Sequence, residues 1–311
     1  MGTGRLYPWN MKILVTGANG YLGRGVVEQL HAMGHRVIAA DFRTDLVCDG
    51  VEKRPCDLFQ IEDPYTFFGE PDVLLHMAWR DGFVHHSAAH MEDLPRHYRF
   101  LERMMRAGIK RVAVMGTMHE IGFYEGSIKA DTPCNPMSLY GISKDALRRA
   151  VQMLSAQTAV PFQWLRGFYI VSSDVHGASI FSKLAAAAQA GKKDFPFTTG
   201  QNQFDFIDYD EFCQQVAAAV TQDRVNGIIN ICSGKPEKLA DRVERFIREN
   251  QFDISLCYGM YPDRPYDSKA VWGSDDKIRQ ILKAAQSMND VCWQTEQANR
   301  NDHPVNTKES R

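Results

Sequence analysis

The sequence predicts an α/β fold, a doubly wound parallel sheet followed by a smaller C-terminal lobe. Short apolar runs alternate with segments of helical periodicity from Met11 to about Tyr169, as a parallel sheet with helices on both faces requires. A glycine-rich turn separates the first apolar run from the first helical segment. The 311 residues are enough for one such sheet and a second lobe.

The glycine turn comprises residues 16–23 and reads Thr-Gly-Ala-Asn-Gly-Tyr-Leu-Gly, between a predicted strand, Met11–Val15, and a predicted helix, Arg24–Met33. In such a turn the first glycine permits a sharp bend, the second lets backbone approach a pyrophosphate, and the third lets the helix pack on the strand. The helix N-terminus offers N–H donors to phosphates. The turn therefore predicts a Rossmann-type dinucleotide site with these contact residues: Gly17, Asn19, Gly20, Tyr21, Leu22 and Gly23.

The second predicted strand, His35–Ala40, ends on Asp41, about twenty residues after the turn. A carboxylate at this position accepts hydrogen bonds from the adenosine ribose and repels a 2′-phosphate, so the sequence favours NAD over NADP. Arg43 follows two residues later and could tolerate that phosphate, which keeps NADP as the less favoured alternative.

The glycine spacing identifies a family. The first gap is two residues wide, and this G-x-x-G-x-x-G form with Thr16 ahead of it resembles the extended short-chain dehydrogenase/reductases, the NAD-dependent epimerase/dehydratase family. The resemblance runs from Met11 to roughly Lys283 and is more specific in the first half. It implies activity on nucleotide-activated sugars and a catalytic tyrosine and lysine four residues apart on one helix.

Tyr140 and Lys144 have that spacing, at the start of a predicted helix that continues to Leu154. Residues i and i+4 share one helix face, so the Lys144 ammonium can lie beside the Tyr140 hydroxyl and the nicotinamide ribose. A free tyrosine has a pKa of about 10. A neighbouring cation lowers that pKa toward the range useful for proton transfer. We therefore expect Tyr140 and Lys144 to be catalytic.

Thr117 follows the predicted strand Lys110–Met115 and stands five residues before Gly122. The family carries a serine or threonine at this position. The resemblance implies that the Thr117 hydroxyl donates to the substrate oxygen while Tyr140 moves the proton. Nicotinamide then gives or takes hydride at the same carbon.

Further cofactor contacts are implied by the same resemblance. Asp57 and Leu58 look like the family's adenine-contacting turn, and Met77 and Ala78 end a predicted strand whose exit runs along the cofactor diphosphate. The segment Phe204–Glu211 resembles the family's R-D-F-I-x-V-x-D motif, with phenylalanine in place of the arginine.

The reaction type depends on residues around these positions. Sugar-nucleotide 4,6-dehydratases carry Asp-Glu directly after the catalytic threonine, where this chain has Met118 and His119, and Glu120 comes one position late. Dehydration is therefore not expected. Arg264-Pro265-Tyr266-Asp267-Ser268 resembles the R-P-x-x-S element of 4-keto-6-deoxysugar reductases, which implies that Arg264 pairs with the substrate diphosphate.

We expect the substrate to contact Arg80, Thr117, His119 and Arg264, with Trp79 also lining the sugar pocket. Several positions depart from the family pattern. Tyr169 replaces a usual asparagine, and Asp93 stands where the family has an active-site asparagine. These departures point to an unusual substrate pose or to a substrate other than a standard sugar nucleotide.

The leading functional hypothesis is an NAD(H)-dependent reductase of a nucleotide-activated 4-keto-6-deoxy sugar, with dTDP as one candidate nucleotide. Hydride reaches C4 while Tyr140 donates a proton to the ketone oxygen. The main alternative is a 4-epimerase that keeps its NAD tightly bound. A non-catalytic NAD-dependent sensor is a remote alternative, because such proteins typically lose the tyrosine or lysine that this chain retains.

Composition limits the partners. The net charge of −2 with dispersed Lys and Arg predicts no nucleic-acid partner, and no apolar run approaches the roughly 18 residues of a membrane span. Seven cysteines without a C-x-x-C spacing and the lack of an export leader favour a reduced cytoplasmic location. The group His85, His86 and His90 is interpreted as substrate-facing or solvated, and no metal is expected.

The chain is predicted to divide into four parts: a disordered extension, 1–10; an NAD-binding domain, 11–170, completed by segments near 205–232; a mainly substrate-binding lobe, 171–285; and a polar tail, 286–311. Later predicted elements are a strand at Gln163–Tyr169, helices at Ser182–Ala190, Glu211–Thr221 and Asp275–Leu282, and a strand at Gly227–Cys232. A homodimer through the helices Leu94–Ala107 and Tyr140–Leu154 is expected from the resemblance.

Overall fold

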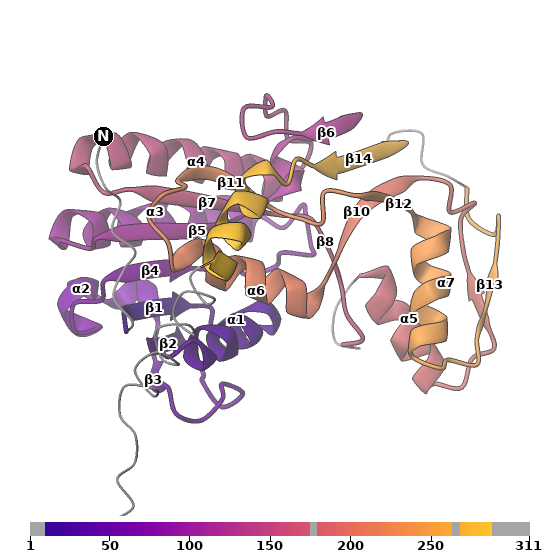
Figure 1. Ribbon diagram of the computed structural model, residues 1–311, viewed down its shortest axis with the longest axis horizontal. Helices are drawn as coiled ribbons and strands as arrows, with labels where there is room; N and C mark the ends of the chain where they lie inside the picture. Colours follow the sequence, from indigo (N-terminus) through magenta and orange to yellow (C-terminus); the bar gives the residue numbers. More distant parts are fainter. Residues whose placement is uncertain (1–9, 175–178, 263–267, 288–311) are drawn as a thin grey trace, which may run out of the picture.

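A seven-stranded sheet forms the larger part of the molecule, shown at the left of Figure 1 in a computed structural model that describes residues 10–174, 179–262 and 268–287. Its strands, in spatial order, are β11 (Gly227–Ile231), β7 (Phe162–Gly167), β5 (Arg111–Thr117), β4 (Val73–His76), β1 (Lys12–Thr16), β2 (Arg36–Asp41) and β3 (Glu52–Pro55). All neighbouring strands are parallel, which confirms the predicted Rossmann-type α/β class.

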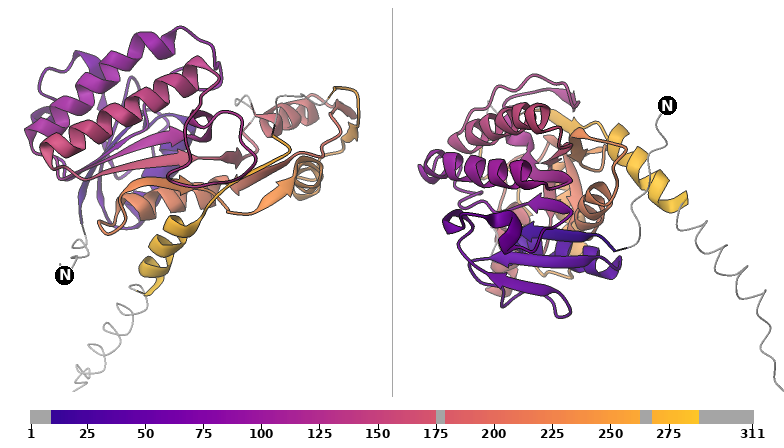
Figure 2. Two further views of the ribbon diagram at one scale, coloured as in Figure 1. Left: turned by 90° about the horizontal axis from the view of Figure 1, so that it is seen from above. Right: turned by 90° about the vertical axis from the view of Figure 1, so that its left-hand side faces the viewer.

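Helices cover both faces of this sheet, as the left view of Figure 2 shows. One face packs against α1 (Tyr21–Ala32), α6 (Tyr209–Val220) and a helix over residues 276–287. The other packs against α2 (Pro64–Phe67), α3 (Ala89–Ala107) and α4 (Leu139–Thr158), with the 3₁₀ turn η1 (Leu58–Gln60) beside α3. A second 3₁₀ turn, η2 (Met118–Glu120), directly follows β5.

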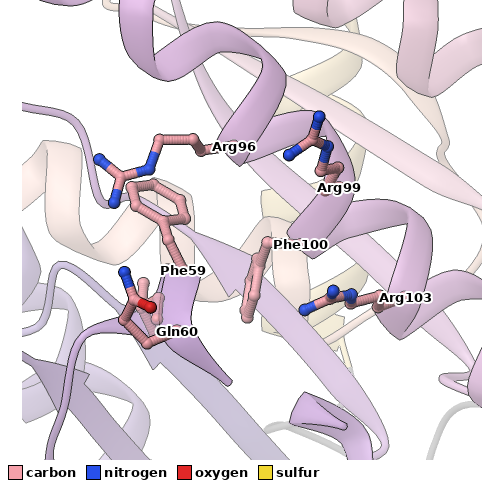
Figure 3. Close-up of a pocket in the computed structure, with 7 residues that line it drawn as sticks. Phe59, Gln60, Arg96, Arg99, Phe100 and Arg103 are labelled. Atoms are coloured by element: carbon pink, nitrogen blue, oxygen red, sulfur yellow. The ribbon is translucent and has the colours of Figure 1, made fainter. Parts of the chain in front are cut away.

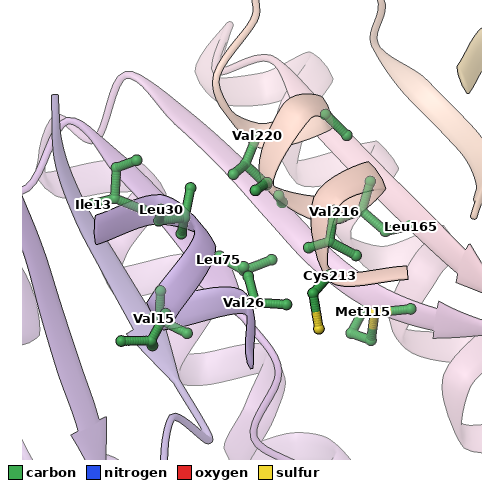
Figure 4. Close-up of a cluster of buried hydrophobic side chains, with 14 of the residues drawn as sticks. Ile13, Val15, Val26, Leu30, Leu75, Met115, Leu165, Cys213, Val216 and Val220 are labelled. Carbon is green, nitrogen blue, oxygen red and sulfur yellow. The ribbon is translucent and has the colours of Figure 1, made fainter. Parts of the chain in front are cut away.

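The strands are apolar on both sides because both faces are covered. Along β1, Ile13 and Val15 belong to the core beneath α1 and α6, whereas Leu14 belongs to the core beneath α3 and α4. Figure 4 shows the first of these cores, where Val26 and other α1 side chains meet side chains of α6 over the sheet. Because successive side chains of a strand point to opposite faces of the sheet, this alternation determines which of the two cores each strand residue enters.

The smaller lobe, at the right of Figure 1, is built around a second sheet that contains β12 (Pro236–Lys238), β10 (Gln203–Asp208), β14 (Ala270–Gly273), β6 (Gly126–Ile128) and β8 (Tyr169–Val171). Its helices are α5 (Ile180–Gln189) and α7 (Leu239–Glu249), and β9 (Asp194–Pro196) pairs with β13 (Ser255–Cys257). An aromatic core joins these elements through Phe181, Phe206 and Phe246.

Asp205 of β10 connects this lobe to the large sheet. Its buried carboxylate accepts hydrogen bonds from the backbone N–H groups of Ser233, Gly234 and Gly273, at 2.8, 3.0 and 3.0 Å, and from the Ser233 hydroxyl at 2.7 Å. One side chain therefore holds together β10, β14 and the loop that follows β11.

Several predicted boundaries were wrong. Helix α1 begins at Tyr21 and not at Arg24, because the third glycine of the turn lies inside the helix. Helix α3 begins at Ala89, five residues before the predicted start. The predicted strand Gln163–Tyr169 is two strands, because Tyr169 leaves the large sheet to pair with Phe206 of β10.

Other expectations concern residues 1–9 and 288–311, which lie outside the described residues. The helix over residues 276–287 continues past the predicted end at Leu282 and into the first residues of the predicted polar tail. Helix α7 was not predicted at all. No helix in the described part of the chain is long and apolar enough to cross a membrane.

Candidate active site

The glycine turn has the geometry of a phosphate-binding turn. Gly17 has φ +70°, and a Cβ there would lie 2.6 Å from the backbone nitrogen of Ala78. A Cβ on Gly23 would lie 2.1 Å from the Gly17 carbonyl oxygen. Helix α1 begins after Gly20 with no side-chain cap and no acidic residue in its first turn, which leaves its N–H donors available to an anion. The turn therefore fits a dinucleotide diphosphate.

Asp41 lies at the carboxyl end of β2, beside this turn. Its carboxylate accepts hydrogen bonds from the backbone N–H groups of Asn19 at 3.0 Å and Phe42 at 2.8 Å. The Asn19 side-chain oxygen accepts a further bond from Leu46 N–H at 2.8 Å. These bonds fix a negative charge next to the glycine turn, where a ribose hydroxyl would donate to it. Arg43 is exposed and lies 3.9 Å from Asp45.

Met77 and Ala78 leave β4 alongside the glycine turn, where Met77 N–H donates to the Thr16 carbonyl at 3.1 Å. Asp57 caps η1 through Phe59 N–H at 3.0 Å. Leu58 is buried at the edge of a cavity of about 240 Å³ between η1 and α3, shown in Figure 3, with these lining residues: Leu58, Phe59, Gln60, Arg96, Arg99, Phe100 and Arg103.

Thr117, Tyr140 and Lys144 come together at the carboxyl end of β5. Thr117 is the last residue of β5, Tyr140 is the second residue of α4, and Lys144 follows one turn later. The Thr117 hydroxyl is close enough to the Tyr140 hydroxyl to lower the pKa of the tyrosine, although burial raises that pKa by more. Lys144 is 3% exposed, and its Nζ donates to the Met115 carbonyl at 2.7 Å. The three predicted catalytic residues are thus neighbours in space.

The start of α4 is fixed by two hydrogen bonds. The Ser138 hydroxyl accepts from Gly141 N–H at 3.1 Å and caps the helix. The Tyr140 N–H donates to the carbonyl of His85 at 2.9 Å, which ties the helix to the segment between β4 and α3. Together these bonds set the position from which the Tyr140 side chain enters the site.

The expectation of a lowered Tyr140 pKa is not met in this structure. Burial raises the pKa of Tyr140 to about 12, against the opposing effect of the neighbouring Thr117 hydroxyl. The physical reason is that Lys144 directs its ammonium to the Met115 carbonyl and to the face of Trp79, whose ring centroid lies 4.0 Å away. Burial also lowers the pKa of Lys144 to about 7, opposed by the charge of Glu120.

Three histidine rings surround the Tyr140 ring. His85 stacks on it with centroids 5.4 Å apart, while His90 and His119 lie at 5.3 and 6.0 Å. Burial lowers the pKa of His119 to about 4 and lowers that of His85. Both rings are therefore neutral near pH 7. His119 was predicted to contact the substrate, whereas His85 and His90 were interpreted as substrate-facing or solvated.

Glu120 was not predicted as part of the site, and it lies directly beneath Thr117. It is fully buried and accepts hydrogen bonds from Thr117 N–H and from Trp164 Nε1–H, both at 2.8 Å. Arg166 approaches its other oxygen at 3.4 Å. The Thr-x-x-Glu spacing at residues 117–120 is a capping-box pattern and could have indicated this contact from the sequence.

The other predicted substrate residues are placed differently. Arg80 binds Asp93 and Glu92 of α3, and its side chain is more than half exposed. Asp93, at the position where the family has an asparagine, also binds Arg96 at 3.1 Å. Arg264 lies outside the described residues. Among the described residues, no group of three or more His, Cys, Asp or Glu side chains is arranged to hold a metal ion.

Comparison with known proteins gives a consistent result. The model of the NAD dependent epimerase/dehydratase family matches residues 13–232. A dTDP-6-deoxy-L-talose 4-dehydrogenase (NAD(+)) from Aggregatibacter actinomycetemcomitans is 40% identical over 270 residues, which are 85% of this chain and 100% of that protein.

Solved structures show the same fold at low sequence identity. A UDP-N-acetylglucosamine 4-epimerase from Methanobrevibacter ruminantium M1 has a TM-score of 0.75 and 16% identity, over 90% of this chain and 100% of that one. A dTDP-glucose 4,6-dehydratase from Streptomyces venezuelae, with NAD bound, has a TM-score of 0.73 and 18% identity, over 87% of this chain and 90% of that one.

Proposed function

Because this chain belongs to the NAD-dependent epimerase/dehydratase family, we propose that it interconverts a dTDP-linked 4-keto-6-deoxyhexose and its 4-hydroxy form with NAD(H). Membership of the family makes the chain an NAD-dependent oxidoreductase or epimerase that modifies nucleotide sugars, in agreement with the sequence prediction. The more specific proposal, redox chemistry at C4 of a dTDP-linked 6-deoxy sugar, is supported by the 40% identity to a 4-dehydrogenase of a dTDP-6-deoxy sugar along that protein's whole length.

The roles of the site residues follow from their positions. When bound, the nicotinamide cofactor would supply the hydride as NADH or accept it as NAD⁺. The glycine turn and Asp41 bind its diphosphate and ribose, with Asp57, Leu58, Met77 and Ala78 proposed as further contacts. In the reducing direction Tyr140 donates its hydroxyl proton to the C4 ketone oxygen as C4 gains hydride, and Thr117 orients that oxygen. Lys144 offers a positive charge one helix turn away.

The segment after Thr117 supports redox chemistry at C4 over elimination of water. Met118 is buried, and the Glu120 carboxylate is turned to Trp164 and Arg166 inside the protein. His119 has a pKa of about 4 and stays neutral beside Tyr140. This segment therefore presents no acid and base pair of the kind that dehydration needs.

The direct test follows nicotinamide absorbance in both directions. Wild-type protein should reduce NAD with dTDP-6-deoxy-L-talose and oxidise NADH with the corresponding 4-keto sugar. The Tyr140→Phe variant should bind NADH normally and turn over at least about 100-fold more slowly. A wild-type protein that shows no redox change, yet copurifies with NAD and converts a UDP-hexose to its C4 epimer, would establish the epimerase instead.

We also propose that the sugar nucleotide binds between the large sheet and residues 171–285, and that Arg80, His119 and Arg264 contact it. The remaining proposals are a cytoplasmic location and a homodimer through α3 and α4. The two helices pack together, and the side chains of Met91 in α3 and Met153 in α4 are exposed. Sedimentation of the purified chain distinguishes a dimer from a monomer.

A further inference from the structure

The ammonium group of Lys144 has an unusual environment for a buried cation. Its Nζ donates a hydrogen bond to a neutral group, the Met115 carbonyl, and within the described residues no carboxylate lies within 4.0 Å of it. A buried charge without a partner is unfavourable, since burial removes the water that would solvate it. The face of the Trp79 indole also lies against it, with the ring centroid 4.0 Å from Nζ.

The face of an indole ring carries negative electrostatic potential and attracts a cation, most strongly where water is excluded. At 4.0 Å the Lys144 ammonium is well inside the range of about 6 Å over which this attraction acts. The same indole ring lies 6.3 Å from the Tyr140 ring. The indole thus lies against the Lys144 ammonium and near the Tyr140 ring.

The position of the indole is fixed at its edge. Trp79 Nε1–H donates to His90 Nδ1 at 3.0 Å, so His90 carries its proton on Nε2 and donates it to the Val84 carbonyl at 3.0 Å. This bond fixes the rotation of the indole in its plane. It also connects Trp79 to the segment that holds the Tyr140 N–H.

The position of the indole is fixed on its face as well. The ring of His97 stacks on it, with centroids 4.4 Å apart and 14° between the planes. His97 bonds to His76 at 2.9 Å, and His76 bonds to the Thr16 hydroxyl of the glycine turn at 2.8 Å. A continuous chain of contacts thus runs from the glycine turn to the Lys144 ammonium through the indole.

The charges around Lys144 agree with this arrangement. The titratable groups that interact electrostatically with it are Glu120 in η2, His76 in β4 and His97 in α3, and Tyr140 lies one turn earlier on its own helix. Burial lowers the pKa of His76 to about 3 and lowers the pKa of His97, so both are neutral and do not repel the ammonium. Glu120 attracts it from a distance but directs its own oxygens to Thr117, Trp164 and Arg166.

We propose that Trp79 is a positioning residue for Lys144: the face of its indole holds the buried ammonium group in place and does the work that a carboxylate partner would otherwise do. The proposal rests on the proposed function for what Lys144 does in turnover. The contact itself can be tested without any sugar substrate. A residue of this kind stabilises the charged form of the lysine, whereas a residue that only fills space does not.

The experiment uses the full-length protein labelled with ¹³C at lysine Cε, with the Lys144 signal assigned from a Lys144→Arg variant. In the wild type, the ring current of Trp79 should shift the Lys144 Hε signals upfield. In Trp79→Leu this upfield shift should disappear, and the Lys144 pKa should fall by about one unit, as expected for a desolvated cation–π contact. Trp79→Phe keeps an aromatic face and should produce less than half of that fall.

Fluorinated tryptophan at position 79 tests whether the electrostatic potential of the ring face stabilises the charged Lys144, because the shape and the N–H of the side chain stay the same. Each added fluorine weakens the negative potential of the ring face, so the Lys144 pKa should fall progressively along a mono-, di- and trifluoro series. The same replacement at Trp272 serves as the matched control. Lys277 is an internal control, because its pKa is also lowered by burial but two carbonyls hold its Nζ, at 2.9 Å each.

A wild-type Lys144 signal without an upfield shift, or a Lys144 pKa that stays constant along the fluorinated series, would overturn the proposal. If Trp79→Leu does not fold, the fluorinated proteins still decide the question, since their side chain has the native shape. A failed NADH assay with dTDP sugars contradicts the proposed function and leaves the NMR result intact. The two ideas are therefore tested separately.

Discussion

The carboxylate of Glu120 accepts a hydrogen bond from the backbone N–H of Thr117, with 2.8 Å between Oε1 and N. Since Thr117 ends β5 and Glu120 ends the 3₁₀ turn η2 that follows it, this bond fixes the backbone from which the Thr117 hydroxyl projects toward Tyr140. The same carboxylate faces the fully buried guanidinium of Arg166, whose nearest nitrogen lies 3.4 Å away. A buried ion pair therefore lies under the candidate active site.

We expect Glu120→Gln to lower the free energy of unfolding by about 3 kcal/mol, because it leaves the Arg166 charge buried without a partner. Urea denaturation at pH 7 measures this change. The double variant with Arg166→Met removes both charges and should recover part of the loss. Burial raises the pKa of Glu120, so a Glu120→Gln protein as stable as the wild type would indicate that this carboxyl is already protonated at pH 7.

The Thr117 hydroxyl should matter to turnover and not to cofactor binding. Valine has the shape of threonine without the hydroxyl, so Thr117→Val should lower kcat about 100-fold, the usual cost of one lost transition-state donor. NADH affinity, followed by nicotinamide fluorescence, should change less than twofold because Thr117 is not among the predicted cofactor contacts. Thr117→Ser keeps the hydroxyl and should retain at least about a tenth of the activity. Equal losses in the two variants would indicate a packing role.

The lowered pKa of Lys144 predicts a specific pH dependence of stability. The unfolded state holds the Lys144 proton up to about pH 10.4, whereas the folded state releases it near pH 7. Between these values the unfolded state binds more protons, so this group makes the folded state more stable as the pH rises.

Lys144→Met removes this titration. The free energy of unfolding of the wild type, minus that of the variant, should therefore increase between pH 7 and 10 by on the order of 3 kcal/mol. Parallel thermal and urea denaturation of the two proteins gives the difference. A difference that stays flat across this range would show that Lys144 keeps its ordinary pKa in the folded protein.

The carboxylate of Asp41 should decide between the two nicotinamide cofactors. Asp41→Asn keeps the shape but loses the charge, so NADH should bind at least about tenfold more weakly, as for the loss of one charge-assisted hydrogen bond. Binding of NADPH should improve relative to NADH, because the repulsion of its 2′-phosphate disappears. Asp45→Asn is the matched control: Asp45 is exposed, bonds to the Asn19 side chain at 3.3 Å, and should leave both affinities unchanged.

Substitutions at two glycines with positive φ distinguish the effect of backbone strain from the effect of a steric clash. Gly17 has φ +70° and its added Cβ would press on the Ala78 backbone, whereas Gly34 has φ +83° and open space around it. We expect Gly34→Ala to cost about 1 kcal/mol of stability and to leave NADH affinity unchanged. Gly17→Ala should abolish detectable NADH binding by calorimetry. Similar NADH affinities in the two variants would mean that the glycine turn does not bind the cofactor.

The sequence allowed prediction of the features that depend on local spacing. The strand before Gly17, the helix after Gly20 and the helix that carries Tyr140 and Lys144 were all expected from periodicity and fixed intervals, and the structure has them. Helix α7 was missed although its pattern is present, since Leu239, Val243, Phe246 and Ile247 follow helical spacing.

Contacts between distant segments could not be predicted in this way. The approach of Trp79 to Lys144 depends on the strand order, which places the exit of β4 next to β5 and the start of α4. The Tyr140 pKa was predicted from the neighbouring lysine alone. The burial that raises it comes in part from the rings of His85, His90 and Trp79, which lie fifty or more residues earlier in the chain.

The contact between α1 and α6 has a consequence for how the chain is made. The Tyr209 hydroxyl donates to the carbonyl of Tyr21, at 2.7 Å and 188 positions away, and accepts a bond from Gly25 N–H at 3.1 Å. Side chains of α6 and β11 pack in the same core as Ile13 of β1 and Val26 of α1. During translation, some two hundred further residues must therefore leave the ribosome before α6 and β11 can cover the apolar faces of β1 and α1. Synthesis that stops near residue 170 would leave a nascent chain with this surface exposed, a substrate for chaperones and proteases.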